Sequence, residues 1–408
     1  MAGRCQDFGK RIREAPGPAS RPWGSCHSPS LPWEFVNDRL TKWAATMAGS
    51  AVDGLRFAHG SPTPGGPLMG LQGRLEREEH EAAELGPGAT RATAGGRRER
   101  AEEPDPVRTC FERDRDRVLH ATAFRRLAGK TQVFVFPDDH QRTRLTHALE
   151  VSQVATAIAR ACRLNVALTE AIALGHDCGH GPGGHASEDA LSPYIEGGYD
   201  HAVWGADVVL APLNLCYETL DGIRNHSWSR PSPATLEGDV VSWADRIAYV
   251  CHDWEDAVAA GIVTPGQLPE VVGRRAGTTR GQQLGAFIDA VASVACEHGV
   301  VAMAEPLAEA LAEFRRANYE RIYLRPASLL QAEAVIAVLQ ALVEHFADRP
   351  NHIPAVREAG GLAAGSVEAL AAAVTYVGGM TDRFAFRTAV ADLGWDPARL
   401  PSGVDLAR

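Results

Sequence analysis

The sequence predicts an all-α protein with a metal site at its centre. Beyond about residue 100, apolar residues recur at helical spacing in almost every segment. Only residues 132–136 have the pattern of a short strand, closed by a Pro-Asp-Asp turn. Histidines and aspartates gather in one part of this helical region, in a combination typical of metal ligands. A helical domain built around that site is therefore expected.

Residues 1–100 differ in composition from the rest of the chain. Proline, glycine, serine and arginine are frequent there, and the apolar residues have little periodicity. Such a segment buries too little apolar surface to offset the entropy lost on ordering. We predict a disordered extension over 1–100, with one short helix near residues 33–47, and a compact domain over 101–408. The internal methionines Met47 and Met69 leave open a later start of translation.

The compact domain is expected to hold a metal-binding core over about 140–260 and C-terminal helices over about 281–390. One helix of the core is predicted at 145–164. The next begins with Thr169 as its N-cap and ends near His176, before a glycine-rich run. Further helices are predicted at 111–128, 202–210, 236–260, 281–297, 302–322, 328–346 and 367–376.

The composition argues against several classes of protein. The 41 basic and 51 acidic residues give a net charge of −10, which disfavours a large nucleic-acid-binding face. No run approaches about 18 uninterrupted apolar residues, and the first residues lack the apolar core of a signal peptide. The eight cysteines have no metal-binding or redox spacing, as expected of reduced thiols. We expect a cytoplasmic protein without a membrane segment.

Four residues are candidate ligands for one divalent metal: His147 on a helix, the adjacent pair His176 and Asp177, and Asp245 on a later helix. Imidazole and carboxylate ligands suit Mn²⁺ or Mg²⁺ first, with Zn²⁺, Fe²⁺ or Co²⁺ as alternatives. Four protein ligands leave positions on a six-coordinate ion open for water and substrate. This arrangement favours a hydrolytic site over a closed structural one.

Further histidines follow the His176-Asp177 pair. His180, His185 and His201 lie within 25 residues of it, and Glu188 follows His185 by three positions. A carboxylate at that spacing can hydrogen-bond an imidazole and raise its basicity. His185 and Glu188 are therefore our first choice for a proton-transfer pair.

Nine blocks of this chain, in order, resemble the HD-domain superfamily of metal-dependent phosphohydrolases. They include Arg144-Leu-Thr-His147, His176-Asp177-Cys-Gly-His180 and Ala244-Asp-Arg-Ile-Ala-Tyr249. Within the superfamily, the chain is most similar to the bacterial dGTPase-like proteins. The blocks fall at residues 108–120, 123–127, 130–134, 140–153, 174–188, 221–226, 236–239, 244–249 and 379–385.

The resemblance implies an HD-domain fold that hydrolyses deoxynucleoside triphosphates, dGTP above all, to deoxynucleoside and tripolyphosphate, in control of the dNTP pool. His147, His176, Asp177 and Asp245 match the metal ligands of the family. The residues around the scissile bond match His180, His185, Glu188 and His201.

The resemblance also implies contacts to the substrate. Arg144 matches an arginine that grips the α-phosphate, and Arg246 matches a basic residue that holds the outer phosphates. Tyr249 and Asp253 match residues near the sugar, and Gln132 matches a position near the sugar and base. Lys130 is expected to help neutralise the triphosphate, which carries about four negative charges.

The chain departs from the family pattern in two loops. It has His180-Gly-Pro-Gly-Gly-His185 where the family reads His-Thr-Pro-Phe-Gly-His, and Ala202-Val-Trp204 follows His201 where the family reads Asn-x-Gln-Ser. We predict that the chemistry is retained with altered selectivity. Two alternatives stay open: an HD phosphohydrolase of another nucleotide class, and a dNTP-binding regulator with little turnover. By analogy a homo-oligomer is expected, with an allosteric dNTP or single-stranded nucleic acid as further candidate ligands.

Overall fold

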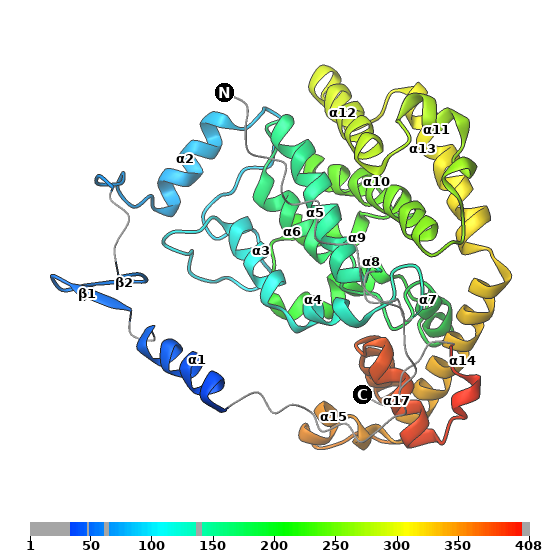
Figure 1. The fold of residues 1–408 in the computed structure, drawn as a ribbon. Helices are drawn as coiled ribbons and strands as arrows, with labels where there is room; N and C mark the ends of the chain where they lie inside the picture. Colours follow the sequence, from blue (N-terminus) through cyan, green and yellow to red (C-terminus); the bar gives the residue numbers. More distant parts are fainter. Residues whose placement is uncertain (1–32, 47–48, 61–64, 136–140, 402–408) are drawn as a thin grey trace, which may run out of the picture. The chain divides into compact units, whose positions relative to one another are not determined.

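The computed structural model describes residues 33–46, 49–60, 65–135 and 141–401 (Figure 1). The chain divides into two compact units, Met1–Gly70 and Leu71–Arg408. The first unit holds helix α1 (Trp33–Thr46), as predicted near residues 33–47, and the hairpin β1 (Ser50–Val52) and β2 (Leu55–Phe57). Asp53 and Gly54 link the strands with positive φ angles of 50° and 79°, as a two-residue hairpin turn requires. The sequence analysis missed this hairpin.

The second unit is helical, which confirms the predicted all-α class for the part of the chain that the structure describes. Short 3₁₀ turns and two π-helical turns, at Gly205–Val209 and Tyr319–Tyr323, join or extend the α-helices. The helices are α2 (Arg74–Glu84), α3 (Cys110–His120), α4 (Thr122–Arg126), α5 (Arg144–Ala161), α6 (Val166–Gly175), α7 (Ala186–Leu191), α8 (His201–Trp204), α9 (Tyr217–Asn225), α10 (Leu236–Ala259), α11 (Glu270–Arg275), α12 (Arg280–His298), α13 (Glu305–Asn318), α14 (Pro326–Asp348), α15 (Pro354–Glu358), α16 (Val367–Gly378) and α17 (Asp382–Leu393).

The larger hydrophobic core is built around α5, α6 and α10, which pack against one another in the middle of the unit (Figure 1). Fully buried side chains such as Val151 and Ile158 on α5 belong to the same core as Val240 and Ile247 on α10. Helices α3, α9, α12 and α13 pack around these three. Helices α5 and α10 carry His147 and Asp245, and His176 and Asp177 follow the end of α6, so the core holds these candidate ligands in place.

A second core forms where α14 packs against α7, α16 and α17. Val338, Leu342 and Phe346 of α14 are buried in it, together with Val374 and Phe386. By length and composition alone α14 could also cross a membrane, but its buried face belongs to this core. The contact of α14 with α7 matters for the site, because α7 follows the glycine-rich loop directly.

The predicted domain boundary at residue 100 is wrong, since residues 71–100 belong to the second unit. The Arg98 guanidinium donates to the fully buried carboxylate of Asp114 at 2.6 Å. The backbone and hydroxyl of Thr90 donate to the buried Glu237 carboxylate at 2.9 and 2.8 Å. Polar anchors hold this stretch, which explains why it lacks the apolar periodicity of a folded segment. Residues 1–32 lie outside the described part of the chain.

Several helix limits also differ from prediction. Helix α6 begins after Asn165, whose side chain accepts from Leu168 N at 3.1 Å, and not at Thr169. The helix predicted over 202–210 ends at Trp204 and continues as a π turn. In the predicted strand, the described residues 132–135 form bends, next to an isolated bridge between Thr131 and Thr143. Thr131 and Thr143 thus pair through one bridge, and the described residues 132–135 belong to no sheet.

Candidate active site

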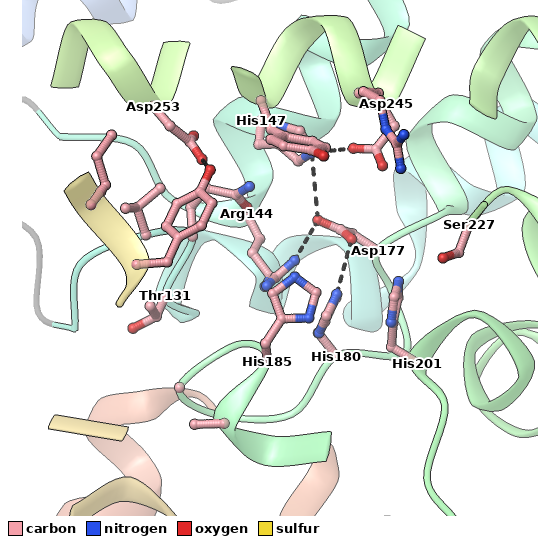
Figure 2. Close-up of a pocket in the computed structure, with 18 of the residues that line it drawn as sticks. Thr131, Arg144, His147, Asp177, His180, His185, His201, Ser227, Asp245 and Asp253 are labelled. Carbon is pink, nitrogen blue, oxygen red and sulfur yellow. Dashed lines mark hydrogen bonds and ion pairs between the residues drawn. The ribbon is translucent and has the colours of Figure 1, made fainter. Parts of the chain in front are cut away.

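One cavity of about 370 Å³ opens where α5, α10, α13 and α14 converge on the glycine-rich loop. Eleven of the fourteen predicted site residues line it. In Figure 2, Asp177 lies between His147 and Asp245 on one side and His180, His185 and His201 on the other. The fold therefore brings residues from three separate stretches of sequence into one pocket.

The four predicted metal ligands converge. Nε2 of His147, on α5, lies 3.0 Å from Oδ1 of Asp245, on α10. Nε2 of His176 lies 3.4 Å from Oδ1 of Asp177 and 3.7 Å from Oδ1 of Asp245, and Oδ2 of Asp177 lies 4.0 Å from Nε2 of His147. Atoms that each sit about 2.1 Å from one ion are separated by about 3.0 Å at right angles and about 4.2 Å when opposite. All four distances fall within that range.

The hydrogen bonds of His176 leave a lone pair for a metal. Its Nδ1 lies 2.7 Å from the Ala173 carbonyl oxygen, which can only accept, so Nδ1 carries the hydrogen. The opposite nitrogen, Nε2, is buried and has no hydrogen-bond partner among the described residues. An orphaned imidazole nitrogen that faces two carboxylates is the arrangement of a metal ligand without its ion. The residues therefore fit a divalent cation.

Charge keeps both carboxylates ionised. Burial alone would raise the pKa of Asp177, but Arg144 and the neighbouring His176 and His180 hold it well below its usual range. Burial likewise opposes ionisation of Asp245, yet the hydrogen bond from His147 and the charges of nearby histidines lower its pKa. Ionised carboxylates are the form that binds a cation.

Arg144 joins the metal ligands to the loop. Its side chain is 2% exposed, and Nη1 donates to Oδ2 of Asp177 at 2.8 Å. Nη2 and Nε are buried without a partner in the described part of the chain, so the guanidinium has donors free for a ligand. Gly184 has a φ of +65°, and a Cβ there would lie 2.9 Å from Nη2. A side chain at position 184 would thus press on Arg144.

In this loop Gly181 and Gly183 depart from the family pattern and Gly184 matches it, and the departure at Gly183 has a structural reason. The φ of Gly183 is +75°, and a Cβ at this position would lie 2.5 Å from Cγ1 of Val335 on α14. Helix α14 therefore occupies the space next to the backbone where the family pattern has phenylalanine. The loop is held by Asp382, which accepts from Gly183 N at 2.8 Å, from Thr131 N at 2.9 Å and from Thr131 Oγ1 at 2.6 Å.

Three histidines surround one carboxylate oxygen, and two of them, His185 and His201, hydrogen-bond to it. Oε1 of Glu188 lies 2.8 Å from Nδ1 of His201, 3.1 Å from Nδ1 of His185 and 3.6 Å from Nδ1 of His180. The rings of His180 and His201 stack with centroids 3.7 Å apart. The His185 side chain is 77% exposed, whereas His180 is buried. All three histidines line the cavity, and His185 is the most exposed of them.

The environments of these groups set their protonation. Burial opposes the charge of Glu188, but its hydrogen bonds with His185 and His201 hold its pKa well below the usual range. Burial alone would lower the pKa of His201, and the bond to Glu188 outweighs this and raises it. For His180, burial dominates and lowers the pKa well below its usual value. The set therefore combines a carboxylate, a basic imidazole and a neutral one.

Asp253 and Tyr249 face the cavity from α10. Both carboxylate oxygens of the buried Asp253 are engaged, one by Arg142 and the other by the hydroxyl of Tyr323. The Tyr249 hydroxyl accepts from Nε of Arg315 at 2.8 Å. Burial opposes ionisation of the Tyr249 hydroxyl and raises its pKa. These contacts hold the two residues in fixed positions along the cavity wall.

Arg246 and Gln132 line other parts of the wall. The Arg246 guanidinium lies 3.3 Å from the ring centroid of Trp228, a cation–π contact that fixes its direction. Oε1 of Gln132 is buried and has no hydrogen-bond partner in the described ranges. Both residues therefore have polar groups available to a ligand.

The predicted contact of Lys130 with the triphosphate is wrong. Lys130 lies outside the cavity lining and is 3% exposed, and Nζ donates to the carbonyl oxygens of His180 and Gly378. Burial lowers the pKa of Lys130 to about 8. The structure thus contradicts a phosphate contact for this residue, which instead ties the backbone at His180 to the end of α16.

Sequence reasoning missed several residues of the site. Arg315, Tyr323 and His226 line the cavity, and Arg142 and Asp382 hold residues that do. His226, Arg142 and Asp382 stood within the matched blocks and could have been considered. Arg315 and Tyr323 belong to a stretch with no motif, so their approach to α10 could be seen only in the folded chain.

Comparisons with known proteins agree with this geometry. Residues 144–250 match the HD domain, and residues 301–390 match the phosphohydrolase-associated domain. A deoxyguanosinetriphosphate triphosphohydrolase-like protein of Caldanaerobacter subterraneus subsp. tengcongensis is 40% identical over 317 residues, covering 76% of this chain and 92% of the relative.

Other proteins of the same description have lower sequence identity to this chain. One from Clostridium perfringens is 37% identical over 306 residues, covering 70% of this chain and 87% of the relative. Another, from Ralstonia nicotianae, is 35% identical over 365 residues, covering 74% and 93%. With an HD domain around the clustered ligands and this identity over most of their length, the chain belongs to the bacterial deoxyguanosinetriphosphate triphosphohydrolase-like proteins of the HD phosphohydrolase family.

Proposed function

We propose that this protein hydrolyses deoxynucleoside triphosphates to deoxynucleoside and tripolyphosphate, with dGTP as the foremost substrate. One observation carries the proposal: a ligand set for a divalent cation and a set of histidines on Glu188 meet across Asp177 in a single cavity. The shared carboxylate puts a cation and a proton source within reach of one phosphate. The names of the relatives support the choice of substrate.

Mn²⁺ or Mg²⁺ held by His147, His176, Asp177 and Asp245 would polarise the α-phosphoryl oxygen and lower the pKa of a bound water. The arginines of the cavity supply the remaining charge. Arg144 has free guanidinium donors beside Asp177, which suits the α-phosphate. Arg246, fixed against Trp228, suits the outer phosphates.

His185 suits the role of proton donor to the departing 5′-oxygen. The attack of water on the α-phosphorus forms one P–O bond and breaks the bond to the 5′-oxygen, which must gain a proton to leave as a hydroxyl. Glu188 engages Nδ1 of His185, so the exposed Nε2 is free to face the leaving group. Glu188 also holds His201 and lies near His180, so these rings keep a fixed orientation around the phosphate.

Tyr249 and Asp253 suit recognition of the deoxyribose. The Asp253 carboxylate already accepts from Arg142 and Tyr323, and its remaining lone pairs can accept a 3′-hydroxyl. The tyrosine ring, held by Arg315, can fill the space that a 2′-hydroxyl would need. Gln132 offers an amide oxygen toward the sugar or base.

The test is product analysis with the full chain. Each dNTP and its ribonucleotide counterpart are incubated with protein and Mn²⁺, and the phosphates released are separated by ion chromatography. Tripolyphosphate from a dNTP is expected, with loss of product in His185→Gln and Asp245→Asn. Release of pyrophosphate or orthophosphate would identify another class of HD phosphohydrolase. Tight dNTP binding with turnover unaffected by His185→Gln would identify a regulator.

A further inference from the structure

Arg142 is a buried arginine that the proposed function uses only as a neighbour of Asp253. It precedes Thr143, the N-cap of α5, its side chain is 7% exposed, and it lies outside the cavity lining. Its guanidinium meets three carboxylates, one at each nitrogen. Nε donates to Oδ2 of Asp256 at 2.8 Å, Nη1 donates to Oε2 of Glu150 at 3.2 Å, and Nη2 donates to Oδ1 of Asp253.

The three carboxylates come from two helices that pack against each other. Glu150 lies on α5, and Asp253 and Asp256 lie three residues apart on α10, so the two aspartates share one face of that helix. Of the three, only Asp253 lines the cavity. Glu150 and Asp256 therefore hold the guanidinium from outside the cavity. The arginine cannot turn away without removing the counter-charge of the buried Asp253 carboxylate.

The second oxygen of Asp253 is held as well. The hydroxyl of Tyr323, which also lines the cavity, donates to Oδ2. The torsion that turns a carboxylate about its Cβ–Cγ bond has broad minima, so a single contact fixes the group poorly. A charged donor on one oxygen and a hydroxyl on the other fix the plane of the carboxylate, and its remaining lone pairs keep one direction.

We infer that Arg142 is the positioning residue that aims the Asp253 carboxylate at the 3′-hydroxyl of the sugar, so that recognition of this hydroxyl depends on a side chain outside the cavity. The inference rests on the proposed function, in which Asp253 accepts the 3′-hydroxyl. Without Arg142 the carboxylate loses its charged donor and is free to turn away from the sugar. Loss of Arg142 should therefore weaken the preference for a substrate that has the 3′-hydroxyl.

The experiment compares dGTP with 2′,3′-dideoxyGTP, which lacks only the 3′-hydroxyl. The kcat/KM for tripolyphosphate release with Mn²⁺ is measured for both nucleotides on the full chain. One hydrogen bond to a charged group corresponds to a preference of about 10–100-fold for dGTP, and we expect that ratio in the wild type. In Arg142→Gln we expect the ratio to fall below about threefold, because the bond to the 3′-hydroxyl is lost.

The ratio separates positioning from support of the fold. A purely structural role would lower kcat/KM for both nucleotides by the same factor and leave the ratio unchanged. Arg280→Gln is the matched control. Arg280 pairs with Glu255 of α10, two residues from Asp253, but both of these side chains are exposed and neither lines the cavity. This variant should keep the wild-type ratio.

Thermal unfolding checks that Arg142→Gln is folded. If it is not, Arg142→Lys replaces it, since lysine keeps the charge but lacks the planar fork that spans three carboxylates. That variant should lower the ratio by at least about threefold.

The outcomes separate this inference from the proposed function. An unchanged ratio in a folded Arg142 variant, or a wild type that turns over both nucleotides equally well, would overturn the positioning role. A wild type that releases no tripolyphosphate would refute the proposed function. The dissociation constants of the two nucleotides, measured by calorimetry, then give the ratio, and equal ratios in the wild type and Arg142→Gln would overturn the positioning role as well.

Discussion

Asp382, at the start of α17, provides the sharpest test of how the second core controls the site. Its carboxylate is 4% exposed and accepts three hydrogen bonds, one from Gly183 N and two from Thr131. The bond to Gly183 fixes the loop that carries His185. Asp382→Asn keeps the shape of the side chain but leaves one acceptor oxygen in place of two.

The energetic cost follows from the lost acceptor. If the Asn oxygen keeps both bonds from Thr131, its NH₂ group faces the N–H of Gly183, and a buried donor is left unpaired at a cost of about 1–3 kcal/mol. Burial raises the pKa of Asp382, so removing its charge returns part of that cost. We expect a net loss of about 1–2 kcal/mol in the free energy of unfolding, or about 2–3 °C in Tm for a unit of this size.

The assays are thermal unfolding and the kinetics of tripolyphosphate release. Because the freed loop no longer holds His185 against the substrate, we expect kcat to fall about 10–100-fold. Mn²⁺ binding should be unchanged, since Asp382 bonds to no metal ligand in the described structure. Asp392→Asn, on the exposed side of the same helix, is the control. An Asp382→Asn protein with wild-type Tm and kcat would refute this account of the loop.

Four further results are expected. A chain that begins at residue 71 should unfold like the full chain. One that begins at residue 101 should lose about 3–5 kcal/mol in urea unfolding, because the loss of Arg98 removes the counter-charge of the buried Asp114 carboxylate, which keeps only its bonds from Cys216 N and Thr219 Oγ1; equal stability of the two chains would contradict this. Burial lowers the pKa of Lys130 from 10.5 in the unfolded chain to about 8 in the folded protein, so its buried charge destabilises the fold below pH 8. Between pH 8 and 10.5 the folded state therefore binds fewer protons than the unfolded state. Wild-type stability relative to Lys130→Met should therefore rise by about 1.4 kcal/mol per pH unit across that window, and a flat difference in urea unfolding would exclude it. Gly184→Ala should raise KM and lower Tm, because its Cβ meets Arg144 and the Thr131 carbonyl at 2.9 and 3.0 Å; an unchanged KM would show that Arg144 does not grip substrate. A chelator should abolish product formation and Mn²⁺ should restore it, as phosphate release assays would measure, and activity that survives chelation would contradict metal dependence.

Much of the fold was predictable because helices are encoded locally. The periodic segments that became α5, α10, α12 and α14 were placed to within a few residues. Segments without such a pattern were misjudged. Residues 71–100 fold because Arg98 and Thr90 bond to buried carboxylates from distant helices, and composition carries no trace of such partners.

In the candidate site, too, features that depend on neighbouring residues were predictable, and features that depend on long-range packing were not. The adjacency of His176 and Asp177, and the spacing of His185 and Glu188, are local, and the structure brings each pair together with the partners expected. Lys130 stands in a matched block but bonds to backbone on the far side of the loop. A motif identifies a residue type, whereas the direction of the side chain depends on the packing around it.

By itself the sequence determined the helical class, the chemistry of the ligand set and the carboxylate that serves the histidines, since these depend on residue type and short-range spacing. Only the tertiary structure decided which groups face one another across the cavity. It placed His226 opposite His201, Arg142 and Tyr323 on Asp253, and Asp382 on the glycine loop. These contacts join elements far apart in the chain, and long-range packing, unlike helical periodicity, leaves no regular pattern in the order of residues.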